Sequence, residues 1–507
     1  SATKIVATIG PASEQLPMLQ HVVDAGLKIM RINFSHATYD EANLRTTNLK
    51  QCVDPLHLDK LSTDRQMCGV MLDTQGPEIR TGQFPDGGEA EVKMGDIVTV
   101  TVDDAHRQQQ TKDRIWISYK DFPTSTHVGA SVLIEDGIME LRVTKILSDT
   151  EVQCEVLNNG GFGNKKGVNL PGQVITLPAI SNKDKSDLSW GVLNDVDYIA
   201  ASFIRKAEDV REIKTFLKEE MAKHGLTGRP EPLIISKIES TEGLNNFDEI
   251  LAISDGIMVA RGDLGVEIPQ ESLLLVQKEI VRKAHEAGKP VVVATQMLDS
   301  MQKNPRPTRA ECTDVSNAVF DGADCVMLSG ESAKGKYPIQ SVGTMKRIVD
   351  EAAKFLNGEF VSMLPGVTRL SIEGQSRRAY LPSPVGDRER IAASVSDMVG
   401  GIDATGIITV CETGKLARAL SKFRPAAPIF AFVKNAKQAR LLQIHYGVVP
   451  IVGAVEGLSN AQKLDSIVAQ VKQLGLCKAG EKVIVVDGRP RSNDTDAGFG
   501  INVAKVL

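Results

Sequence analysis

The chain lacks any long apolar run. Hydrophobic residues make up 42% of its 507 residues, yet no stretch approaches the roughly 18 apolar residues that a membrane-spanning helix needs. The first residues also lack the pattern of a secretory signal or of a transit peptide. These absences predict a soluble protein of the cytoplasm with no membrane partner. The initiator methionine is missing as well, which leaves open whether residues precede Ser1.

Paired metal-binding or redox cysteines are also missing. The seven cysteines are widely scattered and include no Cys-x-x-Cys pair, so reduced, buried thiols are expected rather than a zinc site or a disulfide framework. A formal charge of -5 lacks the basic excess of a nucleic-acid-binding protein. The expected partners are therefore small molecules and no nucleic acid.

What the chain does have is a repeated βα pattern. Short β-branched runs alternate with amphipathic helical stretches, such as 272–287, which is typical of a parallel sheet covered by helices. Eight such runs occur, at 5–10, 29–35, 69–74, 198–204, 233–239, 256–263, 290–297 and 325–331. They predict an α/β fold built on a (β/α)8 TIM barrel.

Two stretches depart from this pattern. Residues 77–178 alternate apolar and polar positions between Gly and Asp turns, which predicts an inserted small β-barrel domain. Beyond residue 355, a polar segment leads to five more strand candidates, which predict a C-terminal α/β domain. The expected boundaries are 1–76 and 179–355 for the two parts of the barrel, 77–178 for the insert and 356–507 for the C-terminal domain.

Polar residues stand where the predicted barrel strands end, which is where barrel enzymes carry their reactive groups. They come from six strands: Arg31, Asn33, Ser35, Asp73, Thr74, Lys237, Glu239, Arg261, Asp263, Thr295, Gln296, Ser329 and Glu331. Residues two apart on a strand face the same side, so Lys237 is expected beside Glu239, and Arg261 beside Asp263. One isolated pair is more often a solvated charge or a salt bridge, but repetition on six strands indicates a site.

These residue types suit metal-dependent phosphoryl transfer. Glu239 and Asp263 offer carboxylate oxygens from neighbouring strands, which suit Mg2+ with positions left for substrate oxygens. Lys237 adds a positive charge where a phosphoryl group can lie, and Arg31 and Arg80 offer further phosphate contacts. A second oxygen-rich group carries one formal charge and suits a monovalent cation better: Asn33, Ser35, Asp73 and Thr74.

Two other segments imitate nucleotide-binding motifs. Residues 330–337 match GxxxxGK but have Tyr337 where a P-loop needs Ser or Thr, and the Gly-rich stretch 160–167 lacks the GxGxxG spacing. The second stretch is expected to be a hairpin loop from which Lys165 and Lys166 face phosphates. For His36, a nucleotide contact and a structural role both stay open.

The motifs around these residues resemble those of the pyruvate kinase family, in the order of that family. The matching stretches are KIVATIGPAS, MRINFSHA, LDTQGPEIRTG, KKGVNLPG, SKIE, GIMVARGDLGVEIP, ATQMLDSM, PRPTRAECTDVSNAV and DGADCVMLSGESAKGKYP. The resemblance implies transfer of the phosphoryl group of phosphoenolpyruvate to ADP, which gives pyruvate and ATP in glycolysis. It also implies Mg2+ or Mn2+ and K+ as cofactors, and a homotetramer.

The resemblance implies roles residue by residue. Lys237 stabilises the phosphoryl group and the enolate oxygen, Glu239 and Asp263 hold the divalent ion, and Arg31 grips a phosphate. Asn33, Ser35, Asp73 and Thr74 hold K+, and Glu78 is the residue found in potassium-requiring members. Gly262 and Thr295 bind the substrate carboxylate region. The residues on the nucleotide side are Asn33, His36, Arg80 and Lys166. The insert closes as a lid, and the candidates for supplying a proton to the enolate are Thr295, Ser329 and Glu331.

The chain departs from the family pattern at Gln75, Ala37 and Ser332, and none of these removes a proposed ligand. Thr413, Gly414 and Lys415 stand where regulated members bind a sugar phosphate, whereas residues 486–498 are only loosely similar to the second effector loop. Allosteric control by a sugar bisphosphate is therefore a hypothesis. Two alternatives to the kinase are a metal-dependent carbon-carbon lyase acting on pyruvate or its enolate and a non-catalytic metabolite-binding barrel. The lyase explains neither the β insert with Lys166 nor the monovalent-cation group.

Overall fold

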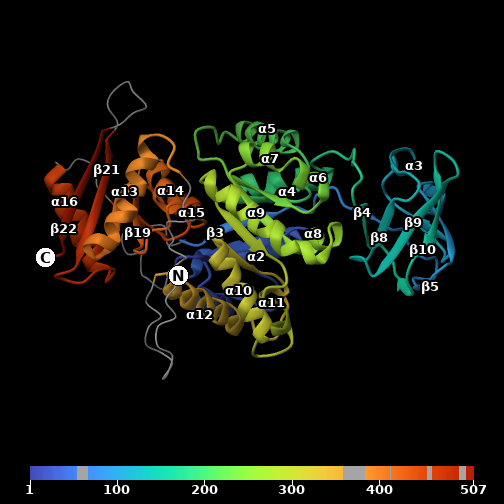
Figure 1. Ribbon diagram of the computed structural model, residues 1–507, viewed down its shortest axis with the longest axis horizontal. Helices are drawn as coiled ribbons and strands as arrows, with labels where there is room; N and C mark the ends of the chain where they lie inside the picture. The colour runs from blue at the N-terminus through green and yellow to red at the C-terminus, as the bar shows by residue number, and fades with distance from the viewer. Residues whose placement is uncertain (54–66, 358–382, 412, 454–459, 490–497) are drawn as a thin grey trace.

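The computed structural model describes residues 1–53, 67–357, 383–411, 413–453, 460–489 and 498–507. Three parts follow one another along its long axis, with the C-terminal α/β domain at one end, a barrel in the middle and the β insert at the other end (Figure 1). The predicted fold class, a TIM barrel with a β insert and a C-terminal α/β domain, is confirmed. Within the described ranges, no helix has both the length and the apolar character needed to cross a membrane.

The barrel consists of eight parallel strands closed in the order β1-β17-β16-β15-β14-β13-β3-β2. Their bounds are β1 (Lys4–Thr8), β2 (Ile29–Asn33), β3 (Gly69–Asp73), β13 (Tyr198–Ala201), β14 (Leu233–Ile238), β15 (Gly256–Ala260), β16 (Val291–Ala294) and β17 (Cys325–Leu328). Seven of the eight predicted runs contain one of these strands, and β1 begins one residue before the predicted run 5–10. The runs are buried on both faces, as expected for a parallel sheet covered by helices.

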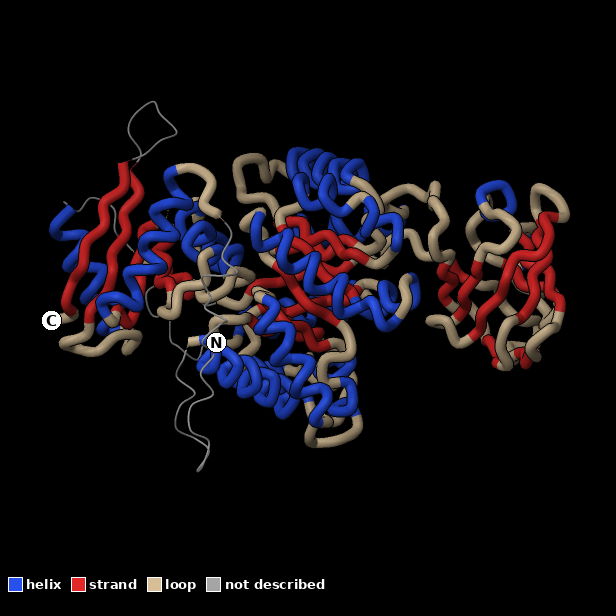
Figure 2. Tube along the Cα trace, viewed as in Figure 1, coloured by secondary structure: helices blue, strands red, loops and turns tan. Residues whose placement is uncertain are grey.

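Helices cover the outside of the barrel, as the blue tubes around the red strands show in Figure 2. They are α1 (Leu16–Ala25), α2 (Tyr39–Gln51), α4 (Asn182–Leu193), α5 (Ala207–Lys223), α6 (Thr241–Asn245), α7 (Phe247–Ile253), α8 (Arg261–Glu267), α9 (Leu273–Glu286), α10 (Arg309–Asp321), α11 (Gly330–Ala333) and α12 (Pro338–Leu356). Capping boxes at Thr38, Ser181 and Thr308 fix where α2, α4 and α10 begin.

Two predicted strands give way to a helix. In the run 325–331, β17 ends at Leu328 and α11 begins at Gly330, so Glu331 lies in a helix. The run 256–263 was expected to stay extended and so to place Arg261 and Asp263 on one strand face. The strand β15 instead ends at Ala260, and Arg261 opens helix α8 with Asp263 in its first turn. Residues two apart in a helix do not share a face, so Arg261 and Asp263 diverge.

The insert is a β structure joined to the barrel by the residues on either side of it. Its strands are β4 (Ile79–Arg80), β5 (Ala90–Val92), β6 (Ile97–Thr101), β7 (Arg114–Trp116), β8 (Ser131–Ile134), β9 (Met139–Ile146), β10 (Glu151–Val156), β11 (Gly160–Phe162) and β12 (Gly167–Asn169), with α3 (Phe122–Ser125) between them. Seven of them form the sheet β4-β12-β8-β9-β10-β6-β7. A bridge between Thr81 and Ile117 brings its first and last strands together, so this sheet curls toward a small barrel.

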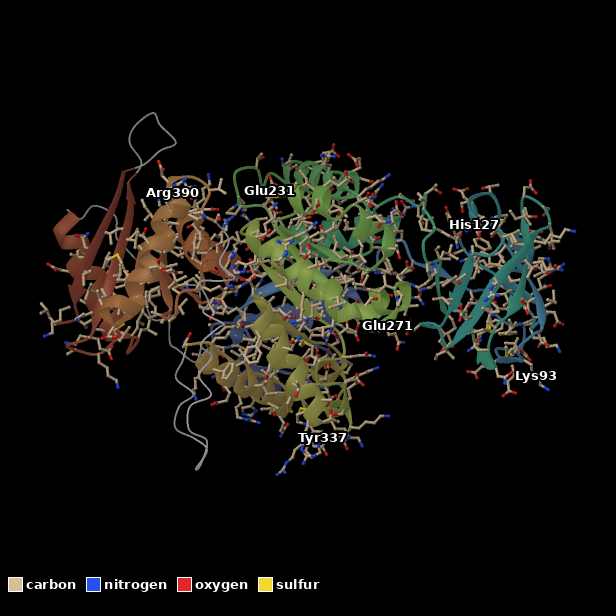
Figure 3. The ribbon with its side chains drawn as sticks, in the orientation of Figure 1. Lys93, His127, Glu231, Glu271, Tyr337 and Arg390 are labelled. Carbon is tan, nitrogen blue, oxygen red and sulfur yellow. The ribbon has the colours of Figure 1, made fainter. Side chains whose placement is uncertain are left out.

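The C-terminal domain is a five-stranded sheet in the order β20-β19-β18-β21-β22. Its elements are α13 (Asp387–Ile402), β18 (Ala404–Val410), α14 (Lys415–Lys422), β19 (Ile429–Val433), α15 (Ala436–Leu442), β20 (Val448–Val452), α16 (Asn460–Gln473), β21 (Lys482–Arg489) and β22 (Gly498–Lys505). Much of the polar segment before this domain lies outside the described residues. Figure 3 labels Arg390 in this domain and Lys93 and His127 in the insert, on opposite sides of the barrel.

The C-terminal domain covers the end of the barrel where the strands begin. Ile444 belongs to the same buried cluster as the side chains that fill the barrel interior, among them Ile29, Tyr198 and Cys325. The hydroxyl of Tyr198 also donates a hydrogen bond to the carbonyl of Arg440. That end is therefore closed by packed residues, which leaves the opposite end, where the strands finish, for chemistry.

Candidate active site

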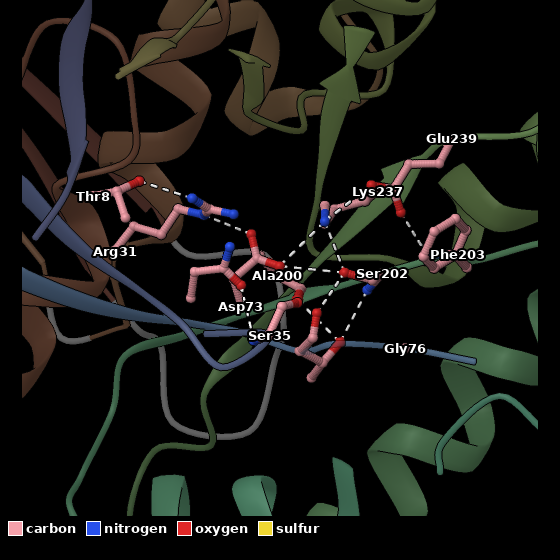
Figure 4. A network of polar contacts seen from close by, with 12 residues as sticks. Thr8, Arg31, Ser35, Asp73, Gly76, Ala200, Ser202, Phe203, Lys237 and Glu239 are labelled. Carbon is pink, nitrogen blue, oxygen red and sulfur yellow. Dashed lines mark hydrogen bonds and ion pairs between the residues drawn. The ribbon is translucent and has the colours of Figure 1, made fainter. Parts of the chain in front are cut away.

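Lys237 lies at the centre of a polar network at the carboxyl end of the barrel (Figure 4). It is the second-last residue of β14 and is only 9% exposed. Its ammonium Nζ lies 2.9 Å from Glu239 Oε1, 3.2 Å from Asp73 Oδ1 and 2.7 Å from Ser202 Oγ. Burial lowers the pKa of a lysine, but the carboxylates of Asp73 and Glu239 outweigh burial and raise the pKa of Lys237 above its usual value. The residue is therefore a permanent buried cation.

Asp73 joins Lys237 to a second cation. Its Oδ2 lies 2.6 Å from Nε of Arg31, whose NH1 donates to the hydroxyl of Thr8 at 2.8 Å. Burial raises the pKa of the Asp73 carboxyl, but Arg31 and Lys237 outweigh it and hold that pKa below its usual value. Two cations, Arg31 and Lys237, therefore flank one buried carboxylate, and both are held in place before an anion arrives.

Glu239 and Asp263 form the expected carboxylate pair, although they lie on different kinds of element. Glu239 follows the end of β14, and its Oε2 accepts a hydrogen bond from the backbone N–H of Phe203 at 2.6 Å. Burial and the nearby charge of Glu239 raise the pKa of Asp263 to about 7. The two carboxylates repel each other when both are ionised, and a bound divalent cation would relieve that repulsion. Carboxylate oxygens are ligands that Mg2+ prefers, so these residues fit Mg2+.

The monovalent-cation group comes together where β2 and β3 end. Asn33 pairs with Asp73 in the strand register, and the side-chain oxygen of Asn33 accepts from the backbone N–H of Ser35 at 3.0 Å. The hydroxyl oxygen of Thr74 accepts from the backbone N–H of Ser202 at 3.0 Å. The four predicted residues thus lie in one region and offer oxygen atoms with the charge of a single carboxylate, a set that fits a monovalent cation.

Two loops at this end of the barrel carry strained backbone. Phe203 after β13 has a φ of 55°, and Thr295 and Gln296 after β16 have φ values of 77° and 55°. This left-handed region is costly for a bulky or β-branched residue and is concentrated at functional sites. Arg261 helps to hold the second loop, because its NH2 donates to the carbonyl of Thr295 at 2.8 Å. Its guanidinium also binds the carboxylate of Asp314 through two contacts of 2.7 Å, so Arg261 supports the site from outside it.

A cleft of about 420 Å³ opens between the barrel and the insert. Its lining includes seven of the predicted residues: His36, Glu78, Arg80, Lys165, Lys166, Glu239 and Asp263.

Two of the insert's cations that line the cleft, Arg80 and Lys166, are paired with acids. The Nε of Arg80 lies 2.7 Å from Glu78, and Lys166 forms a short ion pair with Glu135. The guanidinium of Arg80 also donates to the carbonyl of Lys165 at 2.9 Å. These pairs are partly exposed, so a phosphate group can compete for either cation at small cost.

The remaining predicted residues follow the ends of β15, β16 and β17. A side chain at Gly262 would bring its Cβ within 3.0 Å of the Thr295 side chain, so the two positions are adjacent. Glu331 is 1% exposed, and its two oxygens accept from the backbone N–H groups of Leu298 and Ser329, at 3.1 and 2.7 Å. The Glu331 side chain therefore fixes the loops after β16 and β17.

The most important residue that the sequence reasoning missed is Ser202. It directly follows β13, and its hydroxyl contacts Lys237, Asp73 and the carbonyl of Thr74. The sequence predicted an extended run through residue 204, which placed Ser202 inside a strand, whereas β13 ends at Ala201. Its position near the carboxyl end of that predicted run, like that of the other site residues, was the available signal.

The predicted effector residues lie far along the chain, in the C-terminal domain. Gly414 has a left-handed φ of 72° and directly precedes α14, while Thr413 and Lys415 on either side are exposed. Part of the second effector loop, residues 490–497, lies outside the described residues. Effector binding stays a prediction.

Comparisons with known proteins point to one family. A family model described as the pyruvate kinase barrel domain matches residues 1–342, and one described as the pyruvate kinase alpha/beta domain matches residues 389–507. The chain is 42% identical to a pyruvate kinase of Dictyostelium discoideum, over 96% of this chain and 91% of that protein. It is 40% identical to a pyruvate kinase of Bacillus licheniformis, over 96% of this chain and 77% of that one.

A solved structure extends the similarity to three dimensions. The crystal structure of a pyruvate kinase from Cryptosporidium parvum matches with a TM-score of 0.86 and 35% sequence identity, covering 100% of this chain and 96% of that chain. The similarity therefore includes all three parts of the molecule.

Proposed function

The chain belongs to the pyruvate kinase family and transfers the phosphoryl group of phosphoenolpyruvate to ADP in glycolysis, and we propose that Lys237 is the residue at the centre of that transfer. The observation that carries the proposal is the buried ammonium of Lys237, kept charged by Asp73 and Glu239 at the carboxyl end of the barrel. Phosphoryl transfer asks for positioning and for positive charge around the transferring group. Lys237 supplies a fixed positive charge in a site largely shielded from water, where charge is most effective.

Arg31 is the second phosphate ligand in this proposal. Its guanidinium is held by Asp73 and Thr8, so its orientation is set before the substrate arrives. Lys237 then faces the phosphoryl group and the enolate oxygen of phosphoenolpyruvate, while Gly262 and Thr295 border its carboxylate. Orientation that exists before binding costs nothing at the moment of reaction.

Cations complete the site. Glu239 and Asp263 would hold Mg2+ or Mn2+, and Asn33, Ser35, Asp73 and Thr74 would hold K+. When bound, the cations neutralise the charge of the phosphate oxygens. Glu78 supports the potassium requirement by resemblance, and in the structure it binds Arg80, which places it at the edge of the same cleft.

The nucleotide lies on the insert side of the cleft in this proposal. The residues that contact ADP are Asn33, His36, Arg80 and Lys166. The phosphates displace Glu78 from Arg80 and Glu135 from Lys166. The insert acts as a lid that excludes water and so protects the phosphoryl group from hydrolysis. Thr295, Ser329 and Glu331 are the candidates to position or supply the proton that converts enolate to pyruvate.

The proposal is tested by measuring pyruvate release from phosphoenolpyruvate and ADP. Mg2+ and K+ are each supplied or omitted, with tetramethylammonium chloride keeping the ionic strength constant. We expect turnover with both cations and little without either one. Absence of turnover in the complete mixture would overturn the kinase assignment, and full turnover without K+ would overturn only the monovalent-cation group.

Three further properties are proposed from the family alone: a homotetramer, a cytoplasmic location and a sugar-phosphate effector bound near Thr413, Gly414 and Lys415. Fructose bisphosphates added at low phosphoenolpyruvate are expected to raise the rate, and a flat titration would contradict the effector. Sedimentation of the purified full chain tests the oligomeric state.

A further inference from the structure

Ser202 contacts both Lys237 and residues of the monovalent-cation group. It is 3% exposed, and its Oγ accepts a hydrogen bond from Lys237 Nζ at 2.7 Å. The same Oγ donates to the carbonyl oxygen of Thr74 at 2.6 Å and lies 3.2 Å from Asp73 Oδ1 (Figure 4). A serine hydroxyl has a single proton, so Thr74 and Asp73 share it in alternation. Both of these oxygens belong to residues of the monovalent-cation group.

Of the three contacts that the Lys237 ammonium makes, the hydrogen bond to Ser202 is the weakest. An ammonium has three protons, and in the structure they meet Asp73, Glu239 and Ser202. Two of these acceptors are carboxylates and one is a neutral hydroxyl. A bond to an ionised acceptor is roughly twice as strong as one to a neutral acceptor. An incoming phosphoryl oxygen therefore displaces Ser202 more readily than either carboxylate.

The backbone holds Ser202 in this position from two sides. Its N–H donates to the hydroxyl of Thr74, and the next N–H, that of Phe203, donates to Glu239. Gly76 lies so close that a Cβ there would come within 2.9 Å of the Cβ of Ser202. Phe203 has a strained φ of 55°. With this backbone turn, Ser202 faces the monovalent-cation group and the N–H of Phe203 faces Glu239.

We propose that Ser202 is a positioning residue that couples the monovalent-cation group to Lys237. If this group holds K+, the carbonyl oxygen of Thr74 and Oδ1 of Asp73 would attract the hydroxyl proton of Ser202 less strongly. The hydroxyl then reorients, its bond to Lys237 weakens, and a proton of Lys237 becomes available to the phosphoryl group. This inference rests on the proposed function, in which that group holds K+ and Lys237 meets phosphoenolpyruvate.

Coupling of this kind is reciprocal. If K+ makes Lys237 more available to phosphoenolpyruvate, phosphoenolpyruvate must tighten the binding of K+ by the same factor. The coupling factor is the ratio of the K+ dissociation constant without phosphoenolpyruvate to that with it. It is measurable without turnover, from the rise of the thermal unfolding midpoint with KCl at fixed Mg2+, without ADP and at constant ionic strength.

The decisive variant is Ser202→Ala, matched with Ser236→Ala. Ser236 is also fully buried and directly precedes Lys237, but its hydroxyl bonds to Ser254, outside the site. We expect the wild type and Ser236→Ala to show the same coupling factor, and Ser202→Ala to reduce it at least threefold, with a roughly tenfold loss of kcat. A merely structural role lowers kcat or the unfolding midpoint and leaves the factor unchanged.

The outcomes separate this inference from the proposed function. A reduction of the factor by less than threefold in Ser202→Ala, or no coupling in a wild type that turns over, overturns the role of Ser202 alone. Absence of turnover in the wild type overturns the proposed function instead. If Ser202→Ala does not fold, Ser202→Cys takes its place, because a thiol fills the same space but bonds weakly.

Discussion

The two ends of the barrel bury charge for different purposes. At the carboxyl end, Lys237 and Glu239 lie beside loops with left-handed residues, and Glu239 lines an open cleft. At the amino end, the carboxylate of Asp197 is completely buried and binds Nε of Arg440 through both oxygens, at 3.0 and 3.1 Å. Lys437 adds a further contact of 3.0 Å. Similar ion pairs therefore lie beside an open cleft at one end, where we propose the chemistry, and under the C-terminal domain at the other.

The physical difference lies in what removal of one partner exposes. A buried ion pair contributes little net stability, but loss of one member leaves a charge buried without compensation. At the amino end this cost falls on the packing of the C-terminal domain against the barrel. At the carboxyl end, neighbouring charges and solvent in the cleft compensate for part of this cost. The larger loss is therefore expected in the reaction rate.

The largest effect is expected at the carboxyl end, for Lys237→Met. Loss of one preorganised donor at a transition state costs about 10²- to 10³-fold in kcat, and loss of a buried charge costs more, so we expect kcat to fall by at least about 10³-fold. The far-ultraviolet circular dichroism should stay that of the wild type. Near-normal turnover would show that Lys237 does not carry the reaction.

At the amino end, Arg440→Leu should produce the opposite pattern. It leaves Asp197 with Lys437 as its remaining cation among the contacts above, so we expect the free energy of unfolding in urea to fall by about 3 kcal/mol. The kcat of the folded fraction should stay within about twofold of the wild type. A large loss of kcat with unchanged stability would erase the distinction between the two ends.

A smaller effect is expected from Lys4, also at the amino end. Its Nζ donates to the carbonyl of Val448 at 2.7 Å, and burial lowers its pKa from 10.5 to about 7. The charged form is disfavoured in the folded state, so its full cost applies below pH 7 and disappears as the pH rises toward 10.5. Between pH 7 and 9 this group should add roughly 2 kcal/mol of stability.

Lys4→Met provides the control, because methionine fills similar space without a charge. The difference in unfolding free energy between Lys4→Met and the wild type should shrink as the pH rises from 7 to 9. A constant difference across this range would contradict the lowered pKa.

The smallest effect is expected in the cleft, for Glu135→Gln. The ion pair between Glu135 and Lys166 is partly exposed, and such pairs contribute about 0.2 to 1 kcal/mol. Its removal should free Lys166 and lower the KM for ADP by up to about fivefold, with the KM for phosphoenolpyruvate unchanged. Glu91→Gln, an exposed position elsewhere on the insert, is the matched control. An equal shift in both KM values would place Glu135 outside nucleotide binding.

The sequence predicted the eight strands and most of the charged residues of the site, because β-branched runs and polar strand ends are local patterns. The end of the strand at residue 260 could not be predicted, because a short apolar run followed by Arg-Gly-Asp is compatible both with an extended strand end and with a helix start. Asp263 was therefore predicted as a site residue on a strand, whereas it lies in helix α8.

Long-range pairing was beyond the sequence for a different reason. Arg440 and Asp197 are 243 positions apart, and nothing in either segment indicates the other. The insertion of Ile444 into the barrel interior is likewise a product of domain packing. Ser202 was missed because the predicted run 198–204 placed it inside a strand, whereas β13 ends at Ala201.

The central claim is that this end of the barrel passes a phosphoryl group from phosphoenolpyruvate to ADP while water is kept out. The most direct measurement follows the label of [32P]phosphoenolpyruvate in the presence of ADP, Mg2+ and K+. The account predicts that nearly all released label appears in ATP, and that Lys237→Met releases almost none. Label that appears mainly as free phosphate, or label in ATP at the wild-type rate with Lys237→Met, would contradict it.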